Sequence, residues 1–181
     1  MTTEFNTMQQ IKRRFFAMRN GIIADTLRRA GSPFKIIFGL NLPQISDIAN
    51  EFGQDKALSE TIWANNTTRE SLLLAPMLMP HDEITEAEAS KWIEESPSTE
   101  IIDNLCHHLL RHTAFSFELA DKLCRTDSDK AHYAAMRLLW HHIHTHQQET
   151  KNLAQTEINR NCHLTHQAAL QIVDEIEFLN A

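Results

Sequence analysis

The sequence predicts an all-α protein, an α-solenoid in which short antiparallel helix pairs stack on one another. Apolar residues recur at helical spacing in roughly nine or ten short segments, and no segment alternates like a half-buried strand. The connecting stretches are short, and 4 Gly and 5 Pro leave little chemistry for β-turns. No long heptad pattern is present, so stacked pairs are favoured over a four-helix bundle.

A chain of 181 residues fits one domain, which we expect to cover residues 1–181. The segment 146–181 has the weakest pattern. Gln147 to Arg160 is polar, with Leu153 and Ile158 as its main apolar anchors, so we interpret it as a weak helix or an ordered connector. A last helix follows, with apolar positions at Ala169, Ile172, Ile176 and Leu179.

Helix boundaries in the first half of the chain follow capping residues. One long helix is predicted over Thr7 to Ala30, ended by Gly31. Asn41 can cap a second helix that ends at Gly53, and Asp55 starts a third.

Two segments have the capping-box form, in which Thr is followed three residues later by Glu. Thr67 and Glu70 open a helix in which Pro76 predicts a kink or an early end. Thr85 and Glu88 open the next one.

The central helix is predicted over Ser98 to His112, because apolar residues recur there on one stripe. It also carries Asp103, Cys106 and three histidines, which makes it the first place to look for chemistry. Two further helices are predicted, one across Phe115 to Leu123 and one opened by Ser128.

The composition is that of a globular protein, 42% hydrophobic and 23% charged. No signal peptide is visible, and the longest apolar run, Leu72 to Met79, is too short to span a bilayer. Three cysteines without close pairing fit reduced thiols. We therefore expect a cytoplasmic protein without a membrane partner.

Charge is unevenly distributed along the chain. The net charge of −7 weighs against nucleic acid as a partner, because binding phosphates needs clustered Lys and Arg. Residues 1–35, however, hold seven basic groups against two acidic ones, and the rest of the chain is strongly acidic. This asymmetry fits either a basic face for an anionic partner or an ordinary solvated helix surface.

Eleven histidines invite a metal hypothesis. His108 and His112 are spaced one helical turn apart, as are His142 and His146, so each pair could share a metal ion. No HExxH or paired CxxC motif supports the spacing. We therefore interpret the histidines as structural and expect no metal and no other cofactor.

Cysteine and tryptophan side chains are also interpreted as structural. Cys106 could act as a nucleophile beside His107, but adjacent helical residues point in different directions, so a buried thiol is favoured. Trp63, Trp92 and Trp140 lie on apolar stripes, where core packing is the usual role.

Three segments together resemble the HEAT-repeat-like DNA alkylation repair enzymes, which are glycosylases that remove alkylated bases. Ile37 to Pro43, running into Ile45 to Ala49, looks like the family's FLG-x-x-x-P turn and its next helix. Arg69-Glu70 before an apolar run is similar to the family's RE helix start. Asp103 falls where the family keeps its catalytic aspartate. The similarity spans roughly Arg14 to His146 in order.

The resemblance implies a curl of antiparallel helix pairs with a concave face that binds double-stranded DNA. Aromatic side chains would pack on the deoxyribose, and Asp103 would stabilise the positive charge that develops on the sugar as the base leaves. Arg137 would correspond to the family's DNA-contacting arginine, and Arg69 and Arg111 are further candidates for phosphate contacts.

The sequence departs from the family where its tryptophans are expected. The family has a tryptophan one turn before the aspartate, where this chain has Thr99, and no Trp follows Trp140. These absences argue against catalysis, so two functions stay open. One is an alkylated-base DNA glycosylase that uses Asp103, and the other is a non-catalytic helical scaffold that binds a protein partner on its concave face.

Overall fold

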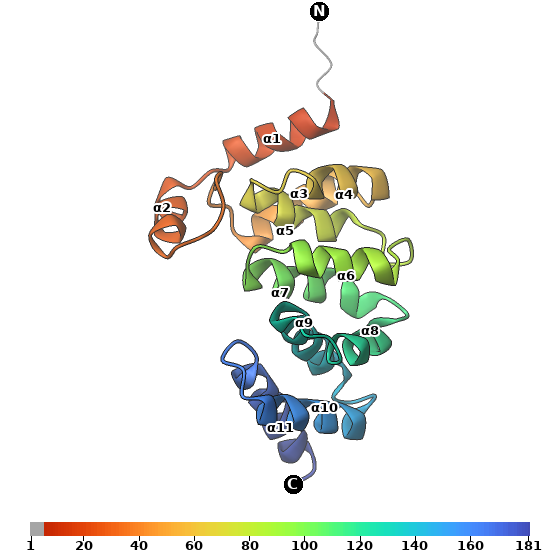
Figure 1. Ribbon diagram of the computed structural model, residues 1–181. Helices are drawn as coiled ribbons and strands as arrows, with labels where there is room; N and C mark the ends of the chain where they lie inside the picture. The colour runs from red at the N-terminus through yellow and green to blue at the C-terminus, as the bar shows by residue number, and fades with distance from the viewer. Residues whose placement is uncertain (1–5) are drawn as a thin grey trace, which may run out of the picture. The chain divides into compact units, whose positions relative to one another are not determined.

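The computed structural model describes residues 6–181, and these residues form eleven α-helices and two 3₁₀ turns (Figure 1). Outside the helices, the described residues make one isolated β-bridge, between Ile36 and Thr68. The helices group into two compact units, Met1–Glu83 and Ile84–Ala181. The predicted all-α class is confirmed, and one domain over residues 1–181 stays a prediction.

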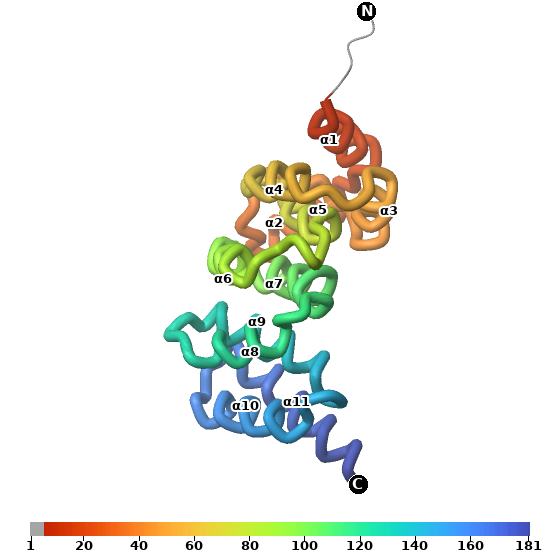
Figure 2. Tube along the Cα trace, turned by 90° about the vertical axis from the view of Figure 1, so that its right-hand side faces the viewer, coloured from red at the N-terminus to blue at the C-terminus, as the bar shows by residue number. Residues whose placement is uncertain are grey.

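The core of the first unit contains α5, whose buried residues include Leu72, Leu73 and Leu74. Helices α3 and α4 both pack against α5 (Figures 1 and 2). The helices of this unit are α1 (Thr7–Ala17), α2 (Gly21–Arg29), α3 (Leu42–Phe52), α4 (Lys56–Trp63) and α5 (Arg69–Leu78).

The second unit is built on α9, which contacts α6, α7, α8 and α11, while α10 and α11 form a closely packed pair. Its core is made of fully buried Leu, Ile and Ala side chains such as Leu105, Leu138 and Ile172. The elements are α6 (Glu86–Glu95), α7 (Thr99–His108), η1 (Leu110–His112), α8 (Ser116–Leu123), α9 (Asp129–Leu139), η2 (Trp140–His142), α10 (Gln147–Arg160) and α11 (His166–Leu179).

The prediction of one helix over Thr7 to Ala30 was wrong. The chain breaks after Ala17, and α2 begins anew at Gly21. The side chain of Asn20 causes the restart, because it accepts hydrogen bonds from the amides of Ile22 and Ile23 and so caps the second helix.

The capping box predicted for Thr67 and Glu70 is also absent. Helix α5 begins after Thr68, whose side chain makes no capping hydrogen bond. The carboxylate of Glu70 is fully buried and instead accepts the amides of Phe38, Gly39 and Leu40, at 3.1, 2.9 and 3.4 Å.

These bonds join the two segments that carried the family resemblance. Arg69 donates from Nη1 to the Leu40 carbonyl at 3.0 Å and to Glu70 Oε1 at 3.2 Å. Gly39 has a φ of +82°, and a Cβ there would lie 2.2 Å from the carbonyl oxygen of Asn20. Only glycine fits this turn, which joins α2, the 36–40 segment and α5.

The remaining boundaries largely follow the sequence pattern. Asn41 and Thr85 form capping boxes, and Asp55 caps α4. Pro76 neither ends nor shortens α5, which continues to Leu78. The predicted central helix ends earlier than expected, at His108, and its last residues form the turn η1.

The polar segment 147–160 is a regular 14-residue helix, α10, with a buried polar cluster at its end. Glu157 accepts from Thr165 Oγ1 at 2.5 Å and from Arg160 at 3.0 Å, and His132 Nδ1 lies 2.6 Å from it. Burial opposes the charge of Glu157, but these bonds outweigh it and lower its pKa. Within residues 6–181, no helix is long and apolar enough to cross a bilayer.

Candidate functional site

The structure brings two of the predicted site residues together in the second unit. Asp103 lies on α7, and its Oδ1 atom is 2.8 Å from Nε of Arg137 on α9. The side chains are 40% and 39% exposed, respectively, so this ion pair lies at the surface and is accessible to a ligand. Packing of α7 against α9 positions the pair.

Tyr133 completes the site. It lies one helical turn before Arg137 on α9, so both side chains point to the same face, and its hydroxyl donates to Asp103 Oδ1 at 2.9 Å. Burial and the neighbouring Asp103 carboxylate raise the pKa of Tyr133 to about 12, so the hydroxyl keeps its proton at neutral pH. This hydrogen bond and the ion pair with Arg137 both involve Oδ1, and no residue described by the structure donates to Oδ2.

Two arginines, Arg111 and Arg137, bring positive charge close to this site. The charges of Arg111 and Arg137 both lower the pKa values of His107 and His141, after burial as the main cause, so both guanidiniums lie near these two rings. The pKa of His141 falls to about 4. The imidazoles are therefore neutral at pH 7, and the two arginines supply the local positive charge.

Arg137 also lines an open hollow of about 590 Å³. Trp140 and Phe178, which are 37% and 77% exposed, lie in its lining. Asp174 and Glu175 on α11 also line it. The prediction of a core role is correct for Trp63 and Trp92, which are buried, but Trp140 is an accessible aromatic side chain next to the Asp103 site, because it lines the same hollow as Arg137.

Arg69 does not belong to this surface. It lies in the first unit with a side chain that is only 6% exposed, and its guanidinium bonds to Leu40 and Glu70 inside that unit. Burial and these bonds leave it unsuited to contact phosphate, so we do not include it among the proposed DNA contacts. Thr99, where the family has tryptophan, is exposed in the first turn of α7.

Cys106, His142 and His146 all contact other residues of the second unit. The Cys106 thiol is buried and faces the Ala134 carbonyl, and burial, with a smaller effect from Asp103, raises its pKa. His146 stacks on Phe117 at a ring distance of 3.9 Å, and His142 bonds to Ser116. Among residues 6–181, no three His, Cys, Asp or Glu side chains are grouped so that they could hold a metal ion.

Comparisons with known proteins identify the family and the fold of the chain. A family model described as DNA alkylation repair enzyme matches residues 11–169. A solved structure from "a new family of proteins related to the HEAT-like repeat DNA glycosylases with affinity for branched DNA structures" matches with a TM-score of 0.78. That match covers 91% of this chain and 73% of that chain at 12% identity, and it shows a shared helical-repeat fold. No curated protein matches the sequence.

Proposed function

Because the chain belongs to the DNA alkylation repair enzyme family, we propose that it acts on DNA as a glycosylase that removes alkylated purines. The observation that carries this proposal is the exposure of the Asp103 carboxylate together with its contacts. Its carboxylate is exposed, it is held in place through one oxygen by Tyr133 and Arg137, and its other oxygen has no partner in the described part of the chain. A fixed and accessible carboxylate is the group that a cationic sugar intermediate requires.

The chemistry needs little beyond this electrostatic group. A purine alkylated on a ring nitrogen carries a positive charge, so it leaves readily when the C1′–N9 bond breaks and takes the bonding electrons with it. The base departs neutral, and the positive charge passes to the deoxyribose. Asp103 stabilises that charge, water adds to C1′ and loses a proton, and an abasic site remains.

Arg137 has two tasks in this proposal. Its guanidinium forms an ion pair with Asp103 through Nε, and no residue described by the structure bonds its two Nη groups. These groups can donate to a DNA phosphate next to the reacting sugar, and Arg111 adds a second positive charge nearby. The guanidinium therefore links the position of the DNA backbone to that of the carboxylate.

The neighbouring hollow supports a cationic base as the substrate. Trp140 and Phe178 offer aromatic faces, on which a nucleobase can stack, and Asp174 and Glu175 add negative charge. Two carboxylates would repel a phosphate, but they favour an alkylated purine that carries a positive charge. Trp140 can thus supply an aromatic contact that Thr99 cannot.

The same hollow favours a second function, a non-catalytic module that binds a protein partner. Exposed aromatic side chains beside carboxylates suit a basic peptide segment, and Trp140 and Phe178 line this hollow together with Asp174 and Glu175. This function requires no reaction at Asp103, so a test of catalysis separates the two.

The test is the release of alkylated purines from methylated duplex DNA under excess protein. We expect release by the wild-type chain, and a loss of about 10²–10³-fold for Asp103→Asn, the typical cost of removing an electrostatic catalyst. Asp121→Asn is the matched control, because Asp121 also pairs with an arginine in the second unit. Wild-type release no faster than the uncatalysed rate would overturn the glycosylase proposal. If salt-sensitive DNA binding were also absent, the partner-binding module would be favoured.

A further inference from the structure

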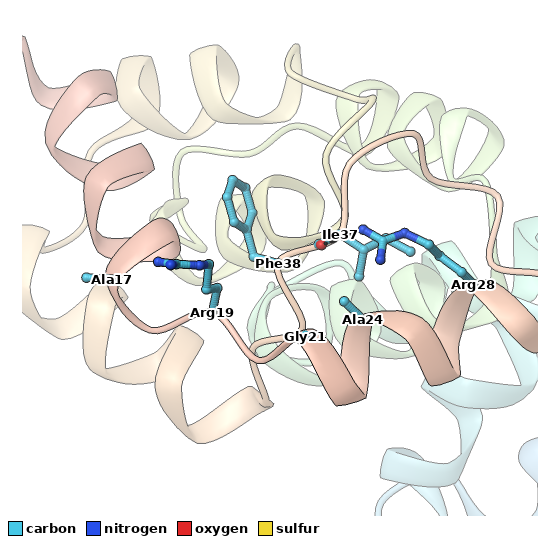
Figure 3. A pocket seen from close by; sticks show the side chains of 7 residues that line it. All are labelled: Ala17, Arg19, Gly21, Ala24, Arg28, Ile37 and Phe38. Atoms are coloured by element: carbon cyan, nitrogen blue, oxygen red, sulfur yellow. Dashed lines mark hydrogen bonds between the residues drawn. The ribbon is translucent and has the colours of Figure 1, made fainter.

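The first unit contains a basic hollow that the proposed reaction does not use. It has a volume of about 500 Å³ and lies between the start of α2 and the 37–38 segment (Figure 3). Arg19 and Arg28 line it from either side of Ile37 and Phe38, as Figure 3 shows. The glycine turn at Gly39 holds this segment against α2, so the hollow has a fixed wall.

Both arginines are held in place by backbone carbonyls. Arg19 donates from Nη1 to the Phe16 carbonyl at 2.7 Å, and its guanidinium lies 3.8 Å from the centre of the Phe16 ring. Arg28 donates from Nη2 to the Ile37 carbonyl at 3.2 Å and from Nη1 to Asp25 at 2.8 Å. A guanidinium has five N–H donors, so each arginine keeps donors for an anion after making these bonds.

The stretch of chain that supplies both arginines is basic although the chain is acidic overall. Between residues 6 and 35 the sequence has seven Lys and Arg residues and one acid, Asp25, while the whole chain has a net charge of −7. Arg14 pairs with Glu51, and Arg28 pairs with Asp25. The stretch also has exposed basic side chains at Lys12, Arg19, Arg29 and Lys35. Such a local excess of positive charge attracts a polyanion.

An aromatic side chain accompanies the charge. Phe16 adjoins the lining residue Ala17 in the chain, and it is 58% exposed even though Arg19 lies over its ring. Positive groups next to an aromatic face are the two components that proteins use to bind single-stranded nucleic acid without sequence preference. Duplex DNA would use the charges but not the aromatic face, because its bases are stacked inside.

We propose that this hollow binds an unpaired DNA strand, with phosphates on Arg19 and Arg28 and a base against Phe16. It is a second nucleic-acid site, on a different unit from Asp103. It shares with the proposed function the premise that the ligand is DNA, but it does not depend on catalysis.

The experiment measures the affinity of the full chain for a fluorescent single-stranded oligothymidine and for a duplex of equal length, over a series of salt concentrations. For Arg19→Ala with Arg28→Ala, we expect about tenfold or more weaker binding of the single strand. The salt slope should be smaller by about 1.4, about 0.7 for each phosphate that is no longer neutralised. Phe16→Ala should weaken single-strand binding about fivefold, with little effect on duplex.

Two controls separate binding from folding and from overall charge. Lys91→Ala with Arg125→Ala removes the same charge from the second unit and should change the affinity less than twofold. Arg19→Lys with Arg28→Lys keeps the charge and should restore most of the binding if the arginines act on phosphate. Far-UV circular dichroism checks that each variant is folded.

The outcomes distinguish this proposal from the proposed function. If the Arg19 and Arg28 variants bind the single strand as tightly as wild type does, this site is refuted, while base release by the wild type would leave the Asp103 proposal standing. The site would also be refuted if the Arg19 and Arg28 variants lost no more affinity for the single strand than the Lys91 and Arg125 control does. Selective loss with unchanged base release from duplex DNA would establish it.

Discussion

Replacing Glu70 by alanine tests the buried connection between the 38–40 turn and α5. In the wild type, the Glu70 carboxylate accepts three backbone amides and pairs with Arg69, and its side chain is fully buried. The substitution removes all of these bonds at once. It also leaves Arg69 as a buried cation without its neighbouring carboxylate, although the guanidinium still donates to the Leu40 carbonyl.

The expected loss in the free energy of unfolding follows from the buried amides and the buried guanidinium that lose the carboxylate. A buried donor that loses its acceptor costs about 1–3 kcal/mol, and breaking a buried ion pair by removing one partner costs about 3–5 kcal/mol. These terms overlap, because Arg69 and the amides share one carboxylate, and local rearrangement admits some water. We therefore expect Glu70→Ala to lower the free energy of unfolding by about 3–5 kcal/mol.

The assay is urea unfolding of the full chain, followed by far-UV circular dichroism. Glu60→Ala is the matched control, because Glu60 is an exposed glutamate of the same unit, 3.9 Å from Lys56. The control should change the free energy of unfolding by less than about 1 kcal/mol. A loss for Glu70→Ala no larger than that of the control would refute the reasoning, because the carboxylate would then contribute nothing specific to the turn.

Three further predictions concern the second unit. Burial and the charge of Arg111 lower the pKa of His141 in the folded chain to about 4. As the pH falls, His141 is therefore protonated in the unfolded chain near pH 6.5, before it is protonated in the folded chain. Stability should therefore fall as the pH drops from 6.5 towards 4, and His141→Gln should reduce this pH dependence in urea unfolding at pH 7 and pH 5. Tyr133→Phe removes one bond to Asp103 and should slow base release about tenfold with a normal fold; an unchanged rate would show that Tyr133 does not position the carboxylate. Cys106, buried and with a raised pKa, should react with a thiol reagent at neutral pH only after unfolding, which mass spectrometry of native and denatured protein checks.

Much of the fold can be predicted from local signals. Caps at Asn41, Asp55 and Thr85 act within one helical turn, so their residue types are sufficient to place three helix starts. The failures involve tertiary partners. Glu70 has the spacing of a capping box, but it bonds to amides about thirty residues earlier in the chain, and nothing near Thr67 reveals that.

The site is only partly visible in the sequence. Asp103 and Arg137 are both predicted site residues, but their contact depends on the packing of α7 against α9. Tyr133 is not among the predicted residues, although it is the single tyrosine of the chain and lies four residues before Arg137, a spacing that could have identified it. Trp140 follows an apolar stripe, which predicts a core position, but the chain turns at η2 and exposes its ring. Burial of Arg69 likewise depends on a distant carbonyl, at Leu40.

The most direct test of the central claim compares two abasic-site analogues in duplex DNA, one with a cationic nitrogen in the sugar ring and one with a neutral ring. If Asp103 stabilises positive charge on the deoxyribose, the wild-type chain should bind the cationic analogue more tightly than the neutral one. Asp103→Asn should lose that preference and keep its affinity for the neutral duplex. Equal affinity of the wild type for both analogues, or a preference that survives in Asp103→Asn, would contradict the account.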